Sequence, residues 1–310
     1  MIRQASAVPE ADVETKPVAR VAPSPFRTYL WSVQRELWEN HSIFIAPLVT
    51  AGLLLVGFVV AAARLPQHRV TTLALAPAVQ RVRIEQPYDF AVSMILLIGG
   101  LVWLFYCLDA LYGERRDRSI LFWKSLPVSD TTTVLAKATI PLAVLPAVLF
   151  VATVATHLGM LLISTVVLRT HGLAPTTTDQ LPLLRLWGAA AYGMVALSLW
   201  NAPIYAWLLM VSAWSRRATL LWALVPPLSL VILEYLAFQT RHVLQFFQWR
   251  GVGWTTEAFA SKPRGSLMVD PMNPIAPLKY LSSPGLWLGL LVAAAFLVAA
   301  IRLRRQRPPL

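Results

Sequence analysis

The chain has 310 residues, of which 57% are hydrophobic and only 14% are charged. A soluble domain of this size usually carries about 25% charged residues, so the composition excludes an ordinary soluble protein and indicates an integral membrane protein. The formal net charge is +12. Because the basic residues form short clusters between apolar runs, they indicate membrane orientation rather than binding to nucleic acid, and we expect no nucleic-acid partner.

The N-terminal region divides into a polar tail and an amphipathic segment. Residues 1–25 contain four prolines and lack the apolar core of a signal peptide, which predicts a disordered cytoplasmic tail. In residues 26–42 the apolar positions repeat at helical spacing: Phe26, Leu30, Val33 and Leu37. We predict a helix that lies in the membrane interface; the alternative is a simple extension of the first span.

Residues 43–310 predict one all-α membrane domain with six spans. A membrane-spanning helix needs about 20 mostly apolar residues. Such runs occupy 40–63, 90–108, 138–168, 186–215, 218–240 and 280–301. The third and fourth runs are longer than one crossing needs, and Pro141 and Pro203 permit kinks within them.

The distribution of lysine and arginine predicts the orientation of the spans. More than half of the 27 Lys and Arg residues lie in the N-terminal tail, in the loops after the second and fourth spans, and at the C-terminus. Basic residues are retained on the cytoplasmic side of a membrane. We therefore expect both termini in the cytoplasm.

The sequence lacks the common catalytic motifs. It contains no Gly-Lys pair, and therefore no nucleotide-binding loop of the Walker A type. It also lacks H-E-x-x-H and G-x-S-x-G. We expect that the chain is not an enzyme and that it binds no metal or cofactor of its own.

Three ionisable residues within the predicted spans are candidates for a functional role, because such residues are costly in hydrocarbon. They are Asp109, His157 and Glu234. A structural role is the favoured interpretation of each. Asp109 would pair with the arginines that follow it, Glu234 with Arg241, and His157 would hydrogen-bond to a neighbouring helix.

Two further patterns within the spans leave alternatives open. Gly285, Gly289 and Ala293 fall four residues apart, which predicts a smooth face for helix packing, either within the chain or between two copies of it. Trp200 and Tyr205 in the fourth span are equally consistent with the core and with the lining of a pathway for an organic substrate.

A compact charged and aromatic segment, YGERRDRSILFWKSLPVSD, separates the second and third spans at residues 112–130. Its apolar positions fit a short helix that Pro127 ends, and Ser129 or Asp130 is suited to cap the next helix. The helix would either touch lipid only or dock on a soluble partner, since exposed aromatic residues with charged neighbours suit a protein groove.

Two motifs resemble those of the permease subunit of type-two ABC exporters. Before the first span, Arg35-Glu36-Leu37-Trp38-Glu39 is similar to an R-E-x-W-E-like motif of that family. Residues 114–129, ERRDRSILFWKSLPVS, are similar to the family pattern E-R-x-D-x-[ST]-I-x-[FL]-W-x-S-L-P-[VI]-[ST]. The order of elements resembles the family over nearly the whole chain from about residue 26, and least in the outer loop 241–279.

The resemblance implies a division of labour between chains. Residues 114–129 would form a coupling helix that sits in a cleft of a separate ABC ATPase subunit, which would use ATP and Mg²⁺. Two permease chains, identical or related, would form the pathway in the lipid of a bacterial inner membrane.

The resemblance implies a coupling role for ten residues: Glu114, Arg115, Arg116, Asp117, Arg118, Ile120, Phe122, Trp123, Lys124 and Leu126. In the interfacial helix the motif residues are Arg35, Glu36, Trp38 and Glu39. The main alternative is a membrane anchor or assembly factor that recruits a partner without transport. A membrane-embedded enzyme is a third alternative.

Overall fold

The computed structural model describes residues 24–125, 128–176, 180–259 and 275–306, with the side chains of Trp123 and Lys124 left undescribed. The predicted tail, 1–25, lies almost entirely outside the described residues. Within these ranges the chain is helical, and its one β-bridge joins Phe259 to Ile275. The predicted all-α class is confirmed for this part of the chain.

The helices follow one another with short connections. Their bounds are α1 Pro25–Glu39, α2 Ser42–Ala62, α3 Leu65–Leu73, α4 Pro77–Asp109, α5 Tyr112–Arg116, α6 Ser119–Ser125, α7 Asp130–Thr139, a π-helical turn Ile140–Val144, α8 Leu145–Thr170, α9 Leu183–Trp200, α10 Ala202–Trp214, α11 Thr219–Phe238, α12 His242–Val252, α13 Trp254–Ala258, α14 Pro277–Ser282 and α15 Pro284–Gln306.

In the part of the chain that the structure describes, six helical segments are long and apolar enough to cross a membrane: 42–62, 77–116, 130–170, 183–200, 219–238 and 284–306. Each overlaps one of the six predicted runs, so a multi-pass membrane protein is confirmed. Both long runs are irregular where a proline permits it. A π-helical turn contains Pro141, and the fourth run breaks at Asn201, just before Pro203, into α9 and α10.

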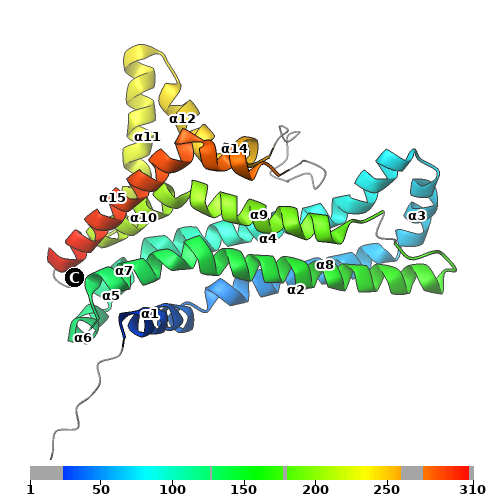
Figure 1. Ribbon diagram of the computed structural model, residues 1–310, viewed down its shortest axis with the longest axis horizontal. Coiled ribbons are helices and arrows are strands. Elements are labelled where there is room, and N and C mark those ends of the chain that lie inside the picture. Colours follow the sequence, from blue (N-terminus) through cyan, green and yellow to red (C-terminus); the bar gives the residue numbers. More distant parts are fainter. Residues whose placement is uncertain (1–23, 126–127, 177–179, 260–274, 307–310) are drawn as a thin grey trace, which may run out of the picture.

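The long helices α2, α4, α8 and α9 run side by side along the molecule, with α3 at one end (Figure 1). The other end holds α1, α5, α6, α7 and the C-terminal part of α15 (Figure 1). We call these the α3 end and the α5 end. Helix α11 projects from the bundle, and α12 returns toward it to form a hairpin (Figure 1).

The small-residue face of α15 packs within the chain. Ala293 packs with Ala202 and Ala206 of α10 in one apolar cluster. A Cβ atom on Gly289 would collide with the guanidinium of Arg250, and one on Gly285 would collide with the Trp249 ring. Both partners belong to α12, so the structure resolves the open alternative in favour of intrachain packing.

Candidate functional site: an ionic cluster at the α5 end

A buried lysine joins two buried carboxylates at the α5 end. The Nζ atom of Lys137 lies 2.8 and 2.9 Å from the two carboxylate oxygens of Glu36 and 3.1 Å from Oε1 of Glu114. All three side chains are almost fully buried. The Tyr106 hydroxyl donates a hydrogen bond of 3.1 Å to the Glu36 carboxylate. The lysine thus ties α1 and α5 to α7.

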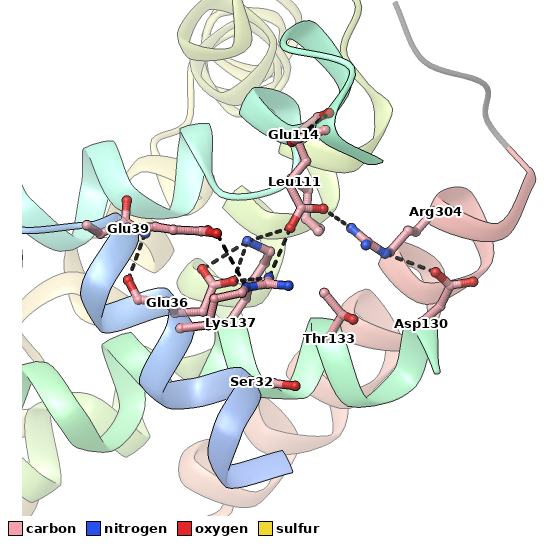
Figure 2. Close-up of polar contacts among 12 residues, drawn as sticks. Ser32, Glu36, Glu39, Leu111, Glu114, Asp130, Thr133, Lys137 and Arg304 are labelled. Carbon is pink, nitrogen blue, oxygen red and sulfur yellow. Dashed lines mark hydrogen bonds and ion pairs between the residues drawn. The ribbon is translucent and has the colours of Figure 1, made fainter. Parts of the chain in front are cut away.

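Two arginines complete the cluster. The Arg304 guanidinium pairs with Glu114 and, at 2.9 Å, with Asp130. The Arg35 guanidinium lies 2.6 Å from Glu36 and 3.3 Å from Glu114. Figure 2 shows the Glu114 carboxylate between Lys137 and Arg304. We call the following residues the ionic cluster: Arg35, Glu36, Glu114, Asp130, Lys137 and Arg304.

At Arg35 and Glu39, burial and neighbouring charges have opposite effects on the pKa. Burial opposes the charge on Arg35, but the carboxylates of Glu36, Glu39 and Glu114 outweigh it and raise the pKa of Arg35. Burial raises the pKa of Glu39, against the opposing charge of Arg35, which lies 3.6 Å away. Glu39 is therefore less firmly held as an anion than an ordinary surface carboxylate.

The cluster connects four helices that are distant in sequence. Glu36 lies on α1, Glu114 on α5, Lys137 on α7 and Arg304 on α15. Ion pairs at this depth add little net stability over an apolar contact, but removal of one partner leaves an uncompensated buried charge that costs about 3–5 kcal/mol. The geometry therefore fixes how the four helices are placed relative to one another.

Arg115 and Ser212 hold α5 against the end of α10. The Arg115 guanidinium donates to the backbone carbonyls of Ser212 and Ser215, where α10 ends. A cation suits these unpaired carbonyls at a helix C-terminus. The Ser212 hydroxyl in turn accepts bonds of 3.0 and 2.9 Å from the backbone N–H groups of Leu111 and Tyr112, which precede and start α5.

The segment predicted as one coupling helix is two short helices. Arg118 adopts a left-handed backbone conformation, with φ 57°, and separates α5 from α6. Ser129 caps α7 as predicted, because its side chain accepts from the Thr132 N–H. The expectation of a single helix over this segment is wrong, since the left-handed residue cannot continue a right-handed helix.

The structure divides the ten predicted coupling residues by exposure. Glu114, Arg115 and Ile120 are buried. Four are exposed: Arg116, Asp117, Arg118 and Phe122. The remaining three, Trp123, Lys124 and Leu126, fall outside what the structure describes, as side chains for the first two and entirely for the third. Leu121 and Phe122 are 57% and 61% exposed, so α6 presents an apolar surface outward.

The predicted interfacial helix, α1, is separate from α2 and ends at Glu39. Its most deeply buried residue is Glu36 rather than an apolar one, because α1 packs on α7 through the ionic cluster. Trp31 and Trp38 are 50% and 67% exposed. The apolar periodicity thus indicated the helix correctly but did not reveal which face is buried.

His157 has a structural environment. Its Nδ1 atom accepts a 3.2 Å bond from the Trp187 indole N–H, so Nε2 carries the proton and donates to the Tyr88 carbonyl at 3.1 Å. These bonds join α8 to α9 and α4. The prediction that His157 bonds to neighbouring helices is confirmed.

Asp109 also makes the predicted pair. Its carboxylate lies 3.7 Å from the Arg116 guanidinium, and both side chains are more than half exposed. Solvent screens a pair with this exposure, so it contributes little to stability. Within the described ranges no group of three or more His, Cys, Asp or Glu side chains could hold a metal ion.

Glu234 has a different partner from the one predicted. Its carboxylate accepts bonds of 2.7 Å from the backbone N–H groups of His242 and Val243 and from the Thr240 hydroxyl. It therefore caps the start of α12. The predicted partner, Arg241, instead lies 5.7 Å from the Tyr235 ring. The unpaired N–H groups of a helix start attract a carboxylate as strongly as a nearby arginine does.

Removal of this cap is expected to loosen the turn between α11 and α12. In the variant Glu234→Ala the amides of His242 and Val243 lose their acceptor, which destabilises the start of α12. Hydrogen exchange followed by mass spectrometry should show about 10-fold faster exchange at the start of α12. The control Glu257→Ala, in α13, should leave this exchange unchanged; equal rates in both variants would contradict the capping role.

Sequence reasoning missed Arg250, which is 6% exposed on α12. Its guanidinium donates to the carbonyls of Trp200 and Gly285 and lies 4.7 Å from the centre of the Trp200 ring. No described carboxylate contacts it. Its acceptors include the last carbonyl of α9, so the break at Asn201 provides the negative end of a helix dipole. One signal in the sequence could have indicated this contact. Arg250 follows several aromatic residues, and Gly285 and Gly289, four residues apart, leave room for its side chain on α15.

Because Arg250 lies close to α15, adding one methyl group at Gly289 is expected to lower the stability of the chain. In Gly289→Ala the new Cβ would overlap the guanidinium, and the shift needed should lower the free energy of unfolding by about 1–3 kcal/mol. Gly188→Ala is the control, because a Cβ there meets no atom within 4 Å. Thermal unfolding in detergent should separate the two variants; equal midpoints would show that α12 does not pack here.

Trp200 and Tyr205, left open as core or pathway residues, are both core. Trp200 is fully buried beneath Arg250, and Tyr205 is 4% exposed with its ring 4.8 Å from that of Trp103.

The comparisons with known proteins found no family model, no curated protein and no solved structure that matches this chain. The function therefore has to be argued from the geometry.

Proposed function

We propose that the chain is the permease subunit of an ATP-driven exporter and that a separate ATPase docks on α5 and α6. The observation that carries the proposal is the position of Glu114. This residue lies on α5, next to the exposed surface of α6, and its carboxylate contacts Lys137, Arg304 and Arg35. Those partners lie on α7, α15 and α1.

The contacts of Glu114 supply a route for mechanical coupling. Helix α7 continues through the π-helical turn into the membrane helix α8, and α15 is itself a membrane helix. A displacement of α5 and α6 would therefore act directly on the ends of two membrane helices. Buried charged contacts suit this task, because sliding them out of register leaves charges unpaired.

The surface of α6 suits a protein partner. Leu121 and Phe122 are exposed at the tip of the α5 end, flanked by the charged residues Arg116, Asp117 and Arg118. An apolar anchor within a charged rim is typical of protein interfaces. The ATPase would bring ATP and Mg²⁺, because the sequence of this chain has no nucleotide-binding loop.

The rest of the assembly follows the same proposal. A second permease chain, identical or related, would complete the pathway, and lipid would contact the exposed tryptophans of α1. The α5 end, with both termini, would face the cytoplasm of a bacterial inner membrane. This orientation agrees with the excess of basic residues in the segments that lie there.

Comparison of cells with and without the gene tests transport directly. An exporter predicts that cells lacking the chain retain a compound that complemented cells release, and that complementation with Phe122→Asp fails to restore release. If both cell types retain and release the same compounds, the chain recruits its partner without transport, as a membrane anchor would.

A further inference from the structure

A large cavity lies between α2, α3 and α4, away from the ionic cluster. Its volume is about 1180 Å³, above the 300–1,000 Å³ of most small-molecule sites. Its apolar lining includes Leu54, Phe58, Phe90, Met94 and Met160. At the α3 end of the bundle, α3 connects α2 to α4 (Figure 1). Its residues Leu65, His68, Thr71 and Thr72 line this space.

The outer part of the cavity is polar and basic. His68 from α3 and Arg83 and Gln86 from α4 line it, and none of the described lining residues is an acid. The Arg83 side chain is exposed, and within the described part of the chain it makes no hydrogen bond or ion pair. A cation that faces a cavity without a counter-ion is a site for an anionic group.

The two parts of the cavity lie at different membrane depths. Helix α4 has 33 residues, a length of about 50 Å against about 30 Å of hydrocarbon. Its first turns hold Arg81 and Arg83, whereas residues 90–108 are free of charge, so we place the first turns beyond the hydrocarbon on the α3 side. Met94 lies about 16 Å further along the helix axis, close to half the hydrocarbon thickness.

We propose that this cavity binds one amphipathic anion, with its carboxylate or phosphate at Arg83 and its hydrocarbon chain among Phe58, Phe90 and Met94. The basic end lies at the level of lipid headgroups, and the apolar depth matches one leaflet of acyl chain. The site does not depend on the docking of an ATPase. The same chemistry fits a lipid that resides there and a molecule that arrives as cargo.

Two glycines of α2 provide a matched pair of variants. A Cβ atom on Gly57 or on Gly52 meets no atom within 4 Å, so a side chain can start from either position without a clash. Gly57 lines the cavity and Gly52 does not. Gly57→Phe should therefore fill the site, and Gly52→Phe should leave it open. Arg83→Gln removes the charge, with Arg185→Gln, an exposed arginine outside the cavity, as its control.

Native mass spectrometry of the full chain in a non-ionic detergent tests the proposal with two probes that share one oleoyl chain. Lysophosphatidate carries a net negative charge and lysophosphatidylcholine carries none. The chain should bind one lysophosphatidate in preference to the zwitterion. Gly57→Phe should weaken this binding at least about 10-fold, and Arg83→Gln should remove about 10-fold of the preference.

Two results would overturn the proposal: equal binding of both probes by the parent chain, or a preference that Gly57→Phe and Arg83→Gln leave unchanged. Either would place the bound lipid on the general lipid-facing surface. A chain purified from its host without added probe distinguishes the sources. A retained anionic lipid identifies a resident, whereas binding only after addition identifies an arriving ligand.

Discussion

Replacement of Lys137 by methionine is expected to lower the free energy of unfolding by about 3–5 kcal/mol. The methionine retains the volume of the side chain but leaves the carboxylates of Glu36 and Glu114 buried without their shared cation. Because three helices meet at this lysine, the loss should affect the whole α5 end. Thermal unfolding in detergent measures it.

Two further variants separate the ionic contact from a general effect of the substitution. Arg305→Met replaces an exposed base on α15, next to Arg304, and should change the stability by less than about 0.5 kcal/mol. Adding Glu36→Gln to Lys137→Met removes one of the two stranded charges and should restore part of the lost stability. An unchanged unfolding midpoint in Lys137→Met would show that the ionic cluster does not hold these helices together.

The double substitution Leu121→Ala with Phe122→Ala is expected to weaken binding of the ATPase at least about 30-fold, the equivalent of about 2 kcal/mol for an interface anchor. Both side chains are more than half exposed on α6, so their removal should leave the thermal stability of the chain unchanged. Binding is measured by titration of the purified ATPase onto the chain in nanodiscs.

A matched control for this pair lies elsewhere on the surface. Leu184 and Phe238 are 79% and 75% exposed on α9 and α11, and their replacement by alanine should leave ATPase binding intact. Glu114→Ala would be a poor test of docking, because this residue is buried in the ionic cluster and its loss should destabilise the chain itself. Equal affinity of the parent chain and the α6 variant would contradict docking at α6.

The sequence alone was sufficient for the membrane architecture because that architecture depends on local properties. Runs nearly free of charge determine the spans, and Pro141 and Pro203 lie where two of them become irregular. Ser129 caps α7 by accepting from an N–H only three residues away. Each of these features depends on residues that are close in sequence, so it can be predicted from the sequence alone.

The ionic cluster could not be predicted in this way. Glu114 and Arg304 are 190 residues apart, and Glu36 and Lys137 are 101 apart. Nothing in the neighbourhood of Lys137 distinguishes it from an exposed lysine on a loop. The motif resemblance placed Glu36 in the interfacial helix and Glu114 in the coupling segment, where both would be at a surface. Their burial depends instead on how α1, α7 and α15 pack together.

The region around α12, from Glu234 to Phe259, shows the same limit on a smaller scale. The glycines of α15 predicted close packing correctly, but the partner, α12, was identified only by the structure. Glu234 had a plausible basic partner nearby in sequence but instead caps the start of α12. The sequence does not show which backbone N–H groups lack a partner within a helix, so this contact could not be predicted.

The central claim, that α5 and α6 connect an ATPase to the membrane helices, is tested most directly by co-purification. The tagged full-length chain is isolated in gentle detergent from its own host, and its companions are identified by mass spectrometry. The account predicts a stoichiometric partner with a Walker A motif, which the double substitution in α6 releases. A folded chain that retains no such ATPase would contradict the account.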